Sequence, residues 1–195
     1  MILCETTSYA VGGEPQVPKF MPPTWLDYIA KASSEDARAR RMAELLLLYT
    51  MCARLGIEPP ALAVLDGGKP DFVGSPYHIG ITNGEGFVAV AIADAPIGID
   101  MEAYVPQPAE RIRRISGILS AGEQAALFAA GEDQNDRFIE IWVRKEALAK
   151  LDGKGLALIR TKATDTANRP PQFEARVRDA NRFRYYYIAG YVALA

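Results

Sequence analysis

The sequence predicts an α+β fold. A long helical segment comes first, a run of short strands separated by turn residues follows it, and two further helical segments precede a final pair of strands. Helices and strands that are grouped in this way favour α+β over a doubly wound α/β sheet, in which the two types alternate one by one. The chain has 195 residues, of which 49% are hydrophobic, so it can bury a core as one domain or as two small ones.

The opening segment, which contains several Gly and Pro residues up to Pro22-Pro23, predicts an irregular arm or an edge element. A helix is predicted next, from Glu35 to Leu55. Ser33 or Ser34 can cap it, and its first turn is acidic, which suits the positive end of the helix dipole. Gly56 ends it.

From residue 61 to residue 103 the pattern changes to short apolar runs separated by Gly, Pro, Asn and Asp, which is typical of strands and turns. The Asn83-Gly84 dipeptide predicts a tight hairpin turn. The expected strands are Leu62 to Leu65, Ile79 to Thr82, Phe87 to Ala93 and Ile97 to Glu102.

Two more helices and two more strands complete the chain. Ser120 and Glu123 have the spacing of a capping box, and Gly131 is expected to stop the helix that they begin. Asn135 is expected to cap a third helix. That helix should run from Asp136 to about Lys150, and the final strands from Phe173 to Val177 and from Tyr185 to Ala193.

Composition excludes several function classes. The 22 basic and 24 acidic residues are dispersed and give a net charge of −2, so no global field favours nucleic acid or an anionic membrane. With one histidine, His78, a His-rich zinc site is impossible, and oxygen ligands for a hard cation are favoured. The two cysteines, Cys4 and Cys52, predict buried thiols rather than a disulfide, and we expect a soluble, cytoplasmic protein.

The stretch from Gly98 to Glu102 carries two carboxylates, Asp100 and Glu102, two positions apart on a predicted strand. Residues with this spacing share one face of a strand, and their Cα atoms lie about 6.6 Å apart, so both side chains can reach one divalent ion. Ile99 and its neighbours would then face the core. The spacing alone favours a solvated strand edge whose acidic residues point outward.

The predicted third helix places Trp142, Glu146 and Lys150 on one stripe, at positions i, i+4 and i+8. By itself this pattern fits an exposed Glu-Lys pair worth about 0.3–0.5 kcal/mol. Bringing Glu146 beside Asp100 and Glu102 would change that interpretation, because three clustered carboxylates require a cation to offset their repulsion.

A further segment, Gly67-Gly68-Lys69-Pro70, presents a lysine on a turn. It is not a Walker motif, because Pro70 stands where that motif requires Ser or Thr and the glycine spacing is wrong. The pattern alone predicts a surface hairpin turn.

Taken in order, these stretches resemble the 4′-phosphopantetheinyl transferase superfamily, in particular the type that activates peptide and polyketide synthetases. Either acidic motif alone is weak, whereas both in the same order are specific. The stretches that carry the resemblance are Gly68-Lys69-Pro70, Ile81-Thr82-Asn83-Gly84, Gly98-Ile99-Asp100-Met101-Glu102, Trp142-Val143-Arg144-Lys145-Glu146-Ala147 with Lys150, and Gly153-Lys154-Gly155-Leu156.

The resemblance implies a pseudo-twofold α+β fold, with an N-terminal half over residues 1–97, a C-terminal half over residues 98–195 and a coenzyme A cleft between them. It implies a magnesium-dependent enzyme that moves the phosphopantetheine arm of coenzyme A onto a serine of an apo acyl or peptidyl carrier protein and releases 3′,5′-ADP. Asp100, Glu102 and Glu146 would hold the Mg²⁺, with Glu146 and Lys150 as catalytic residues. The coenzyme A contacts would come from Arg40, Lys69, Thr82 and Asn83.

One departure from the family pattern bears on activity. The family has Ser-His-Ser where this chain has Thr82-Asn83-Gly84, so a histidine that would bind a coenzyme A phosphate is replaced by an amide. Losing that charge-assisted bond would cost on the order of 1–2 kcal/mol of binding. Two other hypotheses therefore stand beside the active transferase: a catalytically weak or silent homologue that binds coenzyme A or a carrier protein, and an unrelated metal-free α+β domain.

Overall fold

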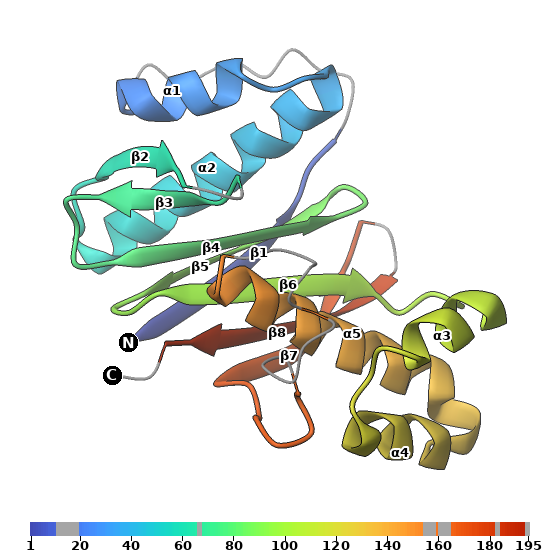
Figure 1. The fold of residues 1–195 in the computed structure, drawn as a ribbon. Coiled ribbons are helices and arrows are strands. Elements are labelled where there is room, and N and C mark those ends of the chain that lie inside the picture. Colours follow the sequence, from blue (N-terminus) through green and yellow to red (C-terminus); the bar gives the residue numbers. More distant parts are fainter. Residues whose placement is uncertain (11–19, 66–67, 154–158, 160–164, 182–183, 194–195) are drawn as a thin grey trace. The chain divides into compact units, whose positions relative to one another are not determined.

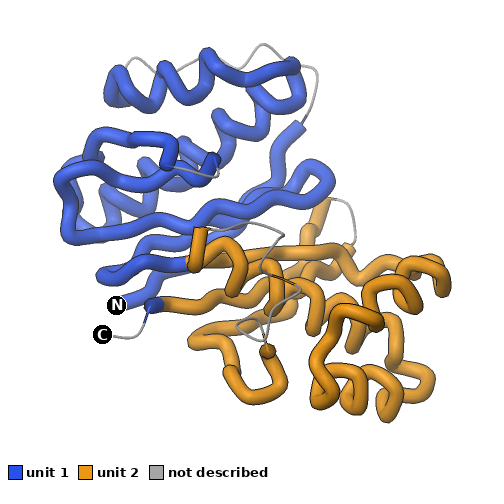
Figure 2. Tube along the Cα trace, in the orientation of Figure 1, with its two compact units in different colours: residues 1–97, 193–195 blue, residues 98–192 orange. Residues whose placement is uncertain are grey.

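The computed structural model describes residues 1–10, 20–65, 68–153, 159, 165–181 and 184–193. It contains two compact units, one of residues 1–97 with 193–195 and the other of residues 98–192 (Figure 2). Both units combine helices with β-sheet, so the predicted α+β class is confirmed (Figure 1). Within the described ranges, no helix combines the length and the apolar character needed to cross a membrane.

The described residues of unit 1 form two helices and five strands. The strands form a three-stranded sheet in the order β1-β5-β4 and a two-stranded sheet of β2 and β3. α2 lies along β5 and β1, and α1 lies against α2 and β2 (Figure 1). The elements are β1 (Ile2–Ser8), α1 (Pro23–Ala30), α2 (Glu35–Leu55), β2 (Ala61–Val64), β3 (Pro70–Val73), β4 (His78–Gly84) and β5 (Phe87–Ala93).

The predicted helix α2 has the expected bounds, and its ends show why. The Ser34 hydroxyl accepts a hydrogen bond from the backbone N–H of Ala37 at 3.1 Å, and Gly56 ends the helix in the left-handed region with φ of 66°. Its inner face, with Leu45, Leu48 and other apolar side chains, is buried in the core of unit 1. Burial of one such leucine contributes about 1.5–3 kcal/mol.

The predicted turn at Asn83-Gly84 is wrong by two residues. Gly84 pairs with Phe87, so the turn consists of Glu85 and Gly86, and Gly86 has the positive φ of 64°. Asn83 is a strand residue opposite Val88. The apolar face of β4 sets the register, because a shift of one residue would turn every buried side chain of the strand to the other face.

The opening segment contains an edge strand, β1, which the sequence left open as an arm or an edge element. All seven of its residues pair with β5, from Ile2 opposite Ala93 to Ser8 opposite Phe87. The short elements α1 and β3 were not predicted. Each is held by tertiary contacts, as when Trp25 of α1 is fully buried and donates to the Pro60 carbonyl at 2.8 Å.

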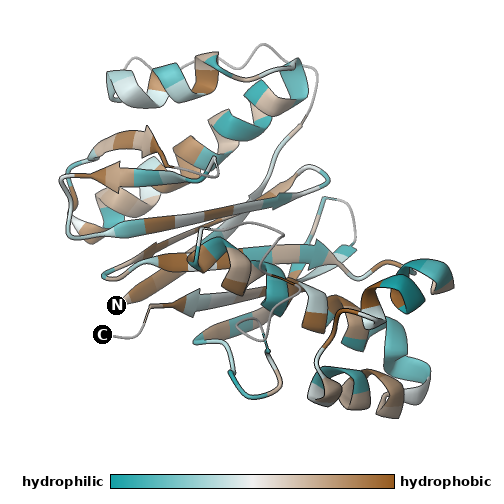
Figure 3. Ribbon diagram, in the orientation of Figure 1, coloured by the Kyte–Doolittle hydropathy of each residue, from teal (hydrophilic) through white to brown (hydrophobic). Residues whose placement is uncertain are grey.

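Unit 2 contains one three-stranded sheet in the order β6-β8-β7, three α-helices and a short 3₁₀ helix among its described residues. α5 packs along β8, and α4 packs on α5. Figure 3 shows hydrophilic residues next to hydrophobic ones on α3. The elements are β6 (Ile97–Ala103), α3 (Ala109–Ser116), α4 (Ala121–Ala129), η1 (Gly131–Asp133), α5 (Gln134–Leu151), β7 (Phe173–Asp179) and β8 (Arg184–Val192).

The capping box at Ser120 and Glu123 is confirmed, since each side chain bonds the backbone N–H of the other residue. The expected cap at Asn135 is wrong. The helix begins at Gln134, and the Asn135 side chain instead binds backbone groups of the segment before α3, accepting from Gln107 N at 2.7 Å and donating to Val105 O at 3.2 Å. Asn135 therefore makes a tertiary contact, although its residue type and position predicted a helix cap.

The two main sheets share one strand order. In unit 1, β1 pairs with β5, the second strand of the β4–β5 hairpin, and β4 lies on the other side of β5. In unit 2, β6 pairs in the same way with β8, the second strand of the β7–β8 hairpin, and β7 lies on the other side of β8. In each unit a long helix, α2 or α5, lies on strands of this sheet.

Candidate functional site

The strand β6 places Asp100 and Glu102 in unit 2. Ile99 and Met101 are buried, as the alternation predicted. Asp100 is itself only 3% exposed, and Glu102 is half-buried. The alternative of a solvated strand edge is therefore wrong for Asp100, because a carboxylate is rarely buried to this extent unless it is paired.

Gly98 is what allows β6 to approach α5 closely. A Cβ atom at this position would lie 2.2 Å from the Ala147 carbonyl oxygen, 2.3 Å from the Leu151 nitrogen and 2.7 Å from the Leu151 Cα. All three are backbone atoms, which cannot move aside as a flexible side chain can. Glycine at position 98 thus brings the strand with Asp100 against the helix with Glu146.

Lys150 of α5 pairs with Asp100. Its Nζ atom lies 2.6 Å from Asp100 Oδ1, and the lysine side chain is 39% exposed while the carboxylate is 4% exposed. Glu146 lies one turn earlier on the same helix and forms a hydrogen bond with Asp100. The interpretation of Glu146 and Lys150 as merely an exposed pair is therefore wrong.

The carboxyl groups interact strongly enough to shift their pKa values. The pKa of Glu146 is raised to about 7, by burial first and by the negative charge of Asp100 second, while Lys150 opposes the shift. The pKa of Glu102 is raised by burial first and by Asp100 second, against the lowering effects of Arg111 and Lys150. The electrostatic repulsion expected of a three-carboxylate cluster is thus present.

The donor set suits a hard divalent cation. Carboxylate oxygens are the ligands that Mg²⁺ prefers, and the Lys150 ammonium already places positive charge against Asp100. Across the part of the chain that the structure describes, no group of three or more Asp, Glu, His or Cys side chains is already arranged to hold a metal ion. Asp100, Glu102 and Glu146 fit the chemistry of the ion as donors, and closer convergence would be required to bind it.

Lys69 follows the turn of the β2–β3 hairpin in unit 1, where Gly68 has a φ of 84°. The predicted hairpin turn is confirmed, since Leu65 N donates to Lys69 O at 2.8 Å. The Lys69 ammonium donates to the Ile97 carbonyl at 2.7 Å, and burial lowers its pKa against the raising effect of Asp71. Gly67 of this motif and residues 154–156 of the last motif lie outside the described residues.

Arg40 and Asn83 are brought together in unit 1. The guanidinium Nη1 of Arg40 donates to Asn83 Oδ1 at 3.2 Å, and its Nε lies 3.5 Å from Oε1 of the buried Glu44, four residues later on α2. Asn83 is exposed on β4, whereas the neighbouring Thr82 is 2% exposed. The sequence predicted all three as ligand-binding residues but gave no sign of Glu44.

A second buried carboxylate in unit 1 escaped prediction. Asp71 Oδ1 accepts backbone hydrogen bonds from Phe72 and Ile79, each at 2.9 Å, and its Oδ2 lies 3.0 Å from His78 Nδ1. The only histidine thus lies beside a carboxylate, not in the place of the family's phosphate-binding histidine. No sequence signal indicates this pairing, because it depends on the packing of β3 against β4.

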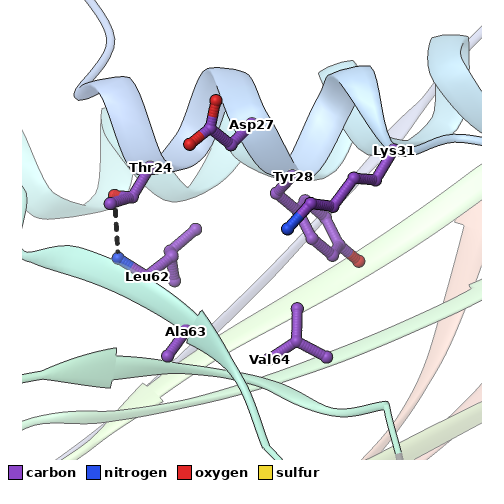
Figure 4. A pocket seen from close by; sticks show the side chains of 7 residues that line it. All are labelled: Thr24, Asp27, Tyr28, Lys31, Leu62, Ala63 and Val64. Atoms are coloured by element: carbon purple, nitrogen blue, oxygen red, sulfur yellow. Dashed lines mark hydrogen bonds between the residues drawn. The ribbon is translucent and has the colours of Figure 1, made fainter.

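A pocket of about 220 Å³ opens between α1 and β2, and Figure 4 shows its lining side chains. None of the predicted site residues lines it. Asp27 and Lys31 lie on its α1 side, and Thr24 Oγ1 accepts a hydrogen bond from the backbone N–H of Leu62 at 3.0 Å. This bond satisfies a backbone donor of β2, so Thr24 has a structural role in the pocket wall.

The two cysteines are not suited to nucleophilic chemistry. The pKa of Cys4 is raised to about 12 by burial first and by Glu5 second, and burial raises the pKa of Cys52 to about 11. The reactive thiolate forms only as the pH rises toward these values. At pH 8 we therefore expect iodoacetamide to leave both thiols intact in the folded protein and to alkylate both in guanidinium, as read by intact mass. Rapid alkylation of the folded protein would contradict this.

Comparison with known sequences agrees with the geometry of unit 2. A sequence model of the 4′-phosphopantetheinyl transferase superfamily matches residues 96–193. A 4′-phosphopantetheinyl transferase of Bacillus subtilis is 30% identical over 128 residues, which are 64% of this chain and 56% of that protein. The psf-1 transferase of Bacillus pumilus is 33% identical over 127 residues, which are 63% of this chain and 53% of that protein.

The chain therefore spans little more than half the length of the curated relatives that it matches. The matched residues include all of β6 and α5, and so the carboxylates Asp100, Glu102 and Glu146 together with Lys150. This protein belongs to the 4′-phosphopantetheinyl transferase superfamily.

Proposed function

We propose that the protein transfers the 4′-phosphopantetheine group of coenzyme A to a serine of an apo acyl or peptidyl carrier protein in the presence of Mg²⁺ and releases 3′,5′-ADP. The observation that carries this proposal is the cluster of Asp100, Glu146 and Lys150, which lies inside the region that matches the family. The relatives that match this region are named 4′-phosphopantetheinyl transferases, which supports the same reaction.

Asp100, Glu102 and Glu146 would hold the Mg²⁺. The ion, when bound, supplies positive charge that offsets the charge of the coenzyme A pyrophosphate. Two features support this assignment: the charge of Asp100 raises the pKa values of Glu102 and Glu146, and Asp100 already attracts a cationic group.

Glu146 and Lys150 are the proposed catalytic residues. The serine oxygen of the carrier protein forms a bond to the phosphorus atom of the phosphopantetheine arm, and the bond from that phosphorus to 3′,5′-ADP breaks. Glu146, directly or through water, takes the proton of the serine hydroxyl. The Lys150 ammonium stabilises the negative charge that grows on the transferred phosphate and on the leaving group.

Unit 1 supplies the proposed coenzyme A contacts. Lys69 would contact the nucleotide end, and Arg40 with Asn83 would bind a phosphate, since a guanidinium and an amide both donate hydrogen bonds to anions. Thr82 is the weaker of the proposed contacts because it is almost fully buried.

The shared strand order of the two main sheets supports the pseudo-twofold relation that the resemblance implies. We propose that residues 1–97 and 98–195 are the two related halves. Both begin with a strand, continue with helices and end with a hairpin. In both, the second strand of that hairpin pairs with the strand that begins the half.

The alternative function is a weak or silent homologue that binds coenzyme A or a carrier protein, and Asn83 in place of a histidine is the observation that favours it. One experiment decides between the two. Apo acyl and peptidyl carrier proteins are incubated with the protein, coenzyme A and Mg²⁺, and their intact masses are measured. We expect a gain of one phosphopantetheine group on at least one carrier; no gain on any of them under conditions in which coenzyme A binds would favour the silent homologue.

The departure at Asn83 gives a second prediction, because Asn83 is an exposed strand residue outside the turn and a histidine can occupy it. We expect Asn83→His to tighten coenzyme A binding about tenfold at pH 6, where an imidazole with a pKa of ~6.5 is charged, and much less at pH 8. Calorimetric titration at both pH values measures this, with Asn83→Gln as the non-titrating control. Equal affinity at both pH values, no better than that of the parent, would exclude Asn83 from the phosphate site.

A further inference from the structure

A buried ion pair joins α5 to α4 in unit 2. Lys145 Nζ lies 2.9 Å from Glu123 Oε2 and 3.1 Å from Oε1, and both side chains are only 1% exposed. Lys145 immediately precedes Glu146 but has no part in the proposed transfer. It is a buried, charged group whose presence the reaction does not explain.

Glu123 connects several chain segments through this pair. Its Oε2 also accepts from Ser120 N at 2.8 Å, and its Oε1 accepts from Thr166 N at 2.9 Å and from Thr166 Oγ1 at 2.8 Å. Ser120 Oγ in turn donates to Asp165 Oδ1 at 2.8 Å. Through Glu123, the start of α4 and residues 165–166 are thereby linked to Lys145 of α5.

Stability alone does not account for such a pair. Taking two charges out of water costs several kcal/mol per ion, and replacing a buried pair with apolar residues of similar volume is often neutral or stabilising. A hydrogen-bonded pair provides direction that an apolar contact does not, because its hydrogen bonds weaken as donor and acceptor become misaligned.

The direction that matters is the rotation of α5 about its own axis. Successive residues of a helix are turned by about 100°, so Glu146 and Lys150 point about 100° and 140° around from Lys145. The contact of Gly98 with the backbone of α5 sets how closely β6 approaches the helix. A second contact, on another side of the helix, is needed to fix which side chains face Asp100.

We propose that the Lys145–Glu123 pair is a positioning device that sets the rotation of α5 and thereby directs Glu146 and Lys150 toward Asp100. The functional part of this inference rests on the proposed transfer reaction. The structural part does not, because the contact of 2.6 Å between Lys150 Nζ and Asp100 Oδ1 can be measured without any substrate.

The test removes both charges together, in the double variant Lys145→Met/Glu123→Gln, so that neither buried charge is left alone. We expect it to fold with a Tm within a few degrees of the parent, to lose at least about tenfold in kcat, and to keep its KM for coenzyme A. In its crystal structure the Lys150–Asp100 separation should exceed the ~4 Å limit of an ion pair. A pair that serves stability alone would change neither kcat nor this separation.

The matched control is a pair that joins the neighbouring residue of α5, Arg144, to Glu174 of β7. Arg144 Nη2 lies 2.6 Å from Glu174 Oε2, but the two side chains are 20% and 44% exposed. Water screens this more exposed pair better than the buried one, so Arg144→Met/Glu174→Gln should keep the kcat of the parent. Loss of turnover in this control equal to that in the buried variant would contradict a special role for Lys145.

A milder variant keeps the test decisive if the double variant does not fold. Thr166→Val removes only the hydroxyl that donates to Glu123, and we expect it to fold and to lose about threefold in kcat, because one of the hydrogen bonds that hold Glu123 is lost. The proposal is wrong if the folded variants keep the kcat of the parent, or if the double variant retains the Lys150–Asp100 contact. If the parent modifies no carrier protein, the proposed function fails, and the crystallographic separation still decides the positioning role.

Discussion

Asp100→Asn is expected to lower phosphopantetheine transfer by about 10³-fold or more, equivalent to ~4 kcal/mol of transition-state stabilisation. The amide has nearly the same shape but no charge, so it removes the partner of Lys150 and one of the three oxygen donors proposed for Mg²⁺. The fold should persist. The initial rate of carrier modification is measured by intact mass, and circular dichroism confirms the fold.

Glu102→Gln and Glu146→Gln should lower the rate in the same way, and the three effects should not add, because the carboxylates act on one ion. Glu132→Gln, which removes an exposed carboxylate of the same unit, is the control and should keep the parent rate. If two of the three site variants turned over near-normally at limiting Mg²⁺, the three-carboxylate site would be wrong.

Gly98→Val is expected to have the largest effect on stability. Its Cβ would enter the space of the Ala147 carbonyl and the Leu151 backbone, so β6 and α5 would have to separate. Overpacking of a core commonly costs 1–3 kcal/mol, and a clash with backbone belongs to the upper end of that range or beyond it. We expect a loss of at least about 3 kcal/mol in the free energy of unfolding, measured by urea denaturation, together with a loss of transfer.

A second glycine of the same unit provides the matched control. A Cβ at Gly117 would lie 3.6 Å from the Arg114 carbonyl oxygen, which is an ordinary contact, and its φ of −67° suits any residue. Gly117→Ala should therefore be neutral or stabilising by up to about 1 kcal/mol. A Gly98→Val protein as stable as the Gly117→Ala protein would show that β6 and α5 do not depend on their close approach.

Local sequence signals predicted those elements whose ends are specified by residues at or next to those ends. α2 has a serine cap, an acidic first turn and a terminal glycine, and α4 has a capping box, so their starts could be predicted from neighbouring residues. The strand β5 lies within a continuous apolar run, and its bounds were predicted correctly. The elements that were missed, α1 and β3, are short and depend on contacts with distant residues.

The same distinction explains the errors. Asn83-Gly84 has the composition of a tight turn, but pairing of β4 with β5 places the turn at Glu85 and Gly86. Asn135 has the composition of a helix cap, but its side chain binds the backbone near residue 105. In both cases a long-range contact outweighed a local preference that is worth only about 1 kcal/mol.

For the candidate site, the sequence by itself determined the residue types: carboxylates two apart on a strand, a Glu and a Lys one turn apart on a helix, and the glycine before them. Only the tertiary structure decided that Asp100 is buried, that Lys150 pairs with it rather than with Glu146, and that Lys145 and Glu123 form a buried pair. The physical reason is that periodicity fixes which side chains share a face, whereas burial and pairing depend on how closely two elements approach, and here that is set by a missing Cβ at Gly98.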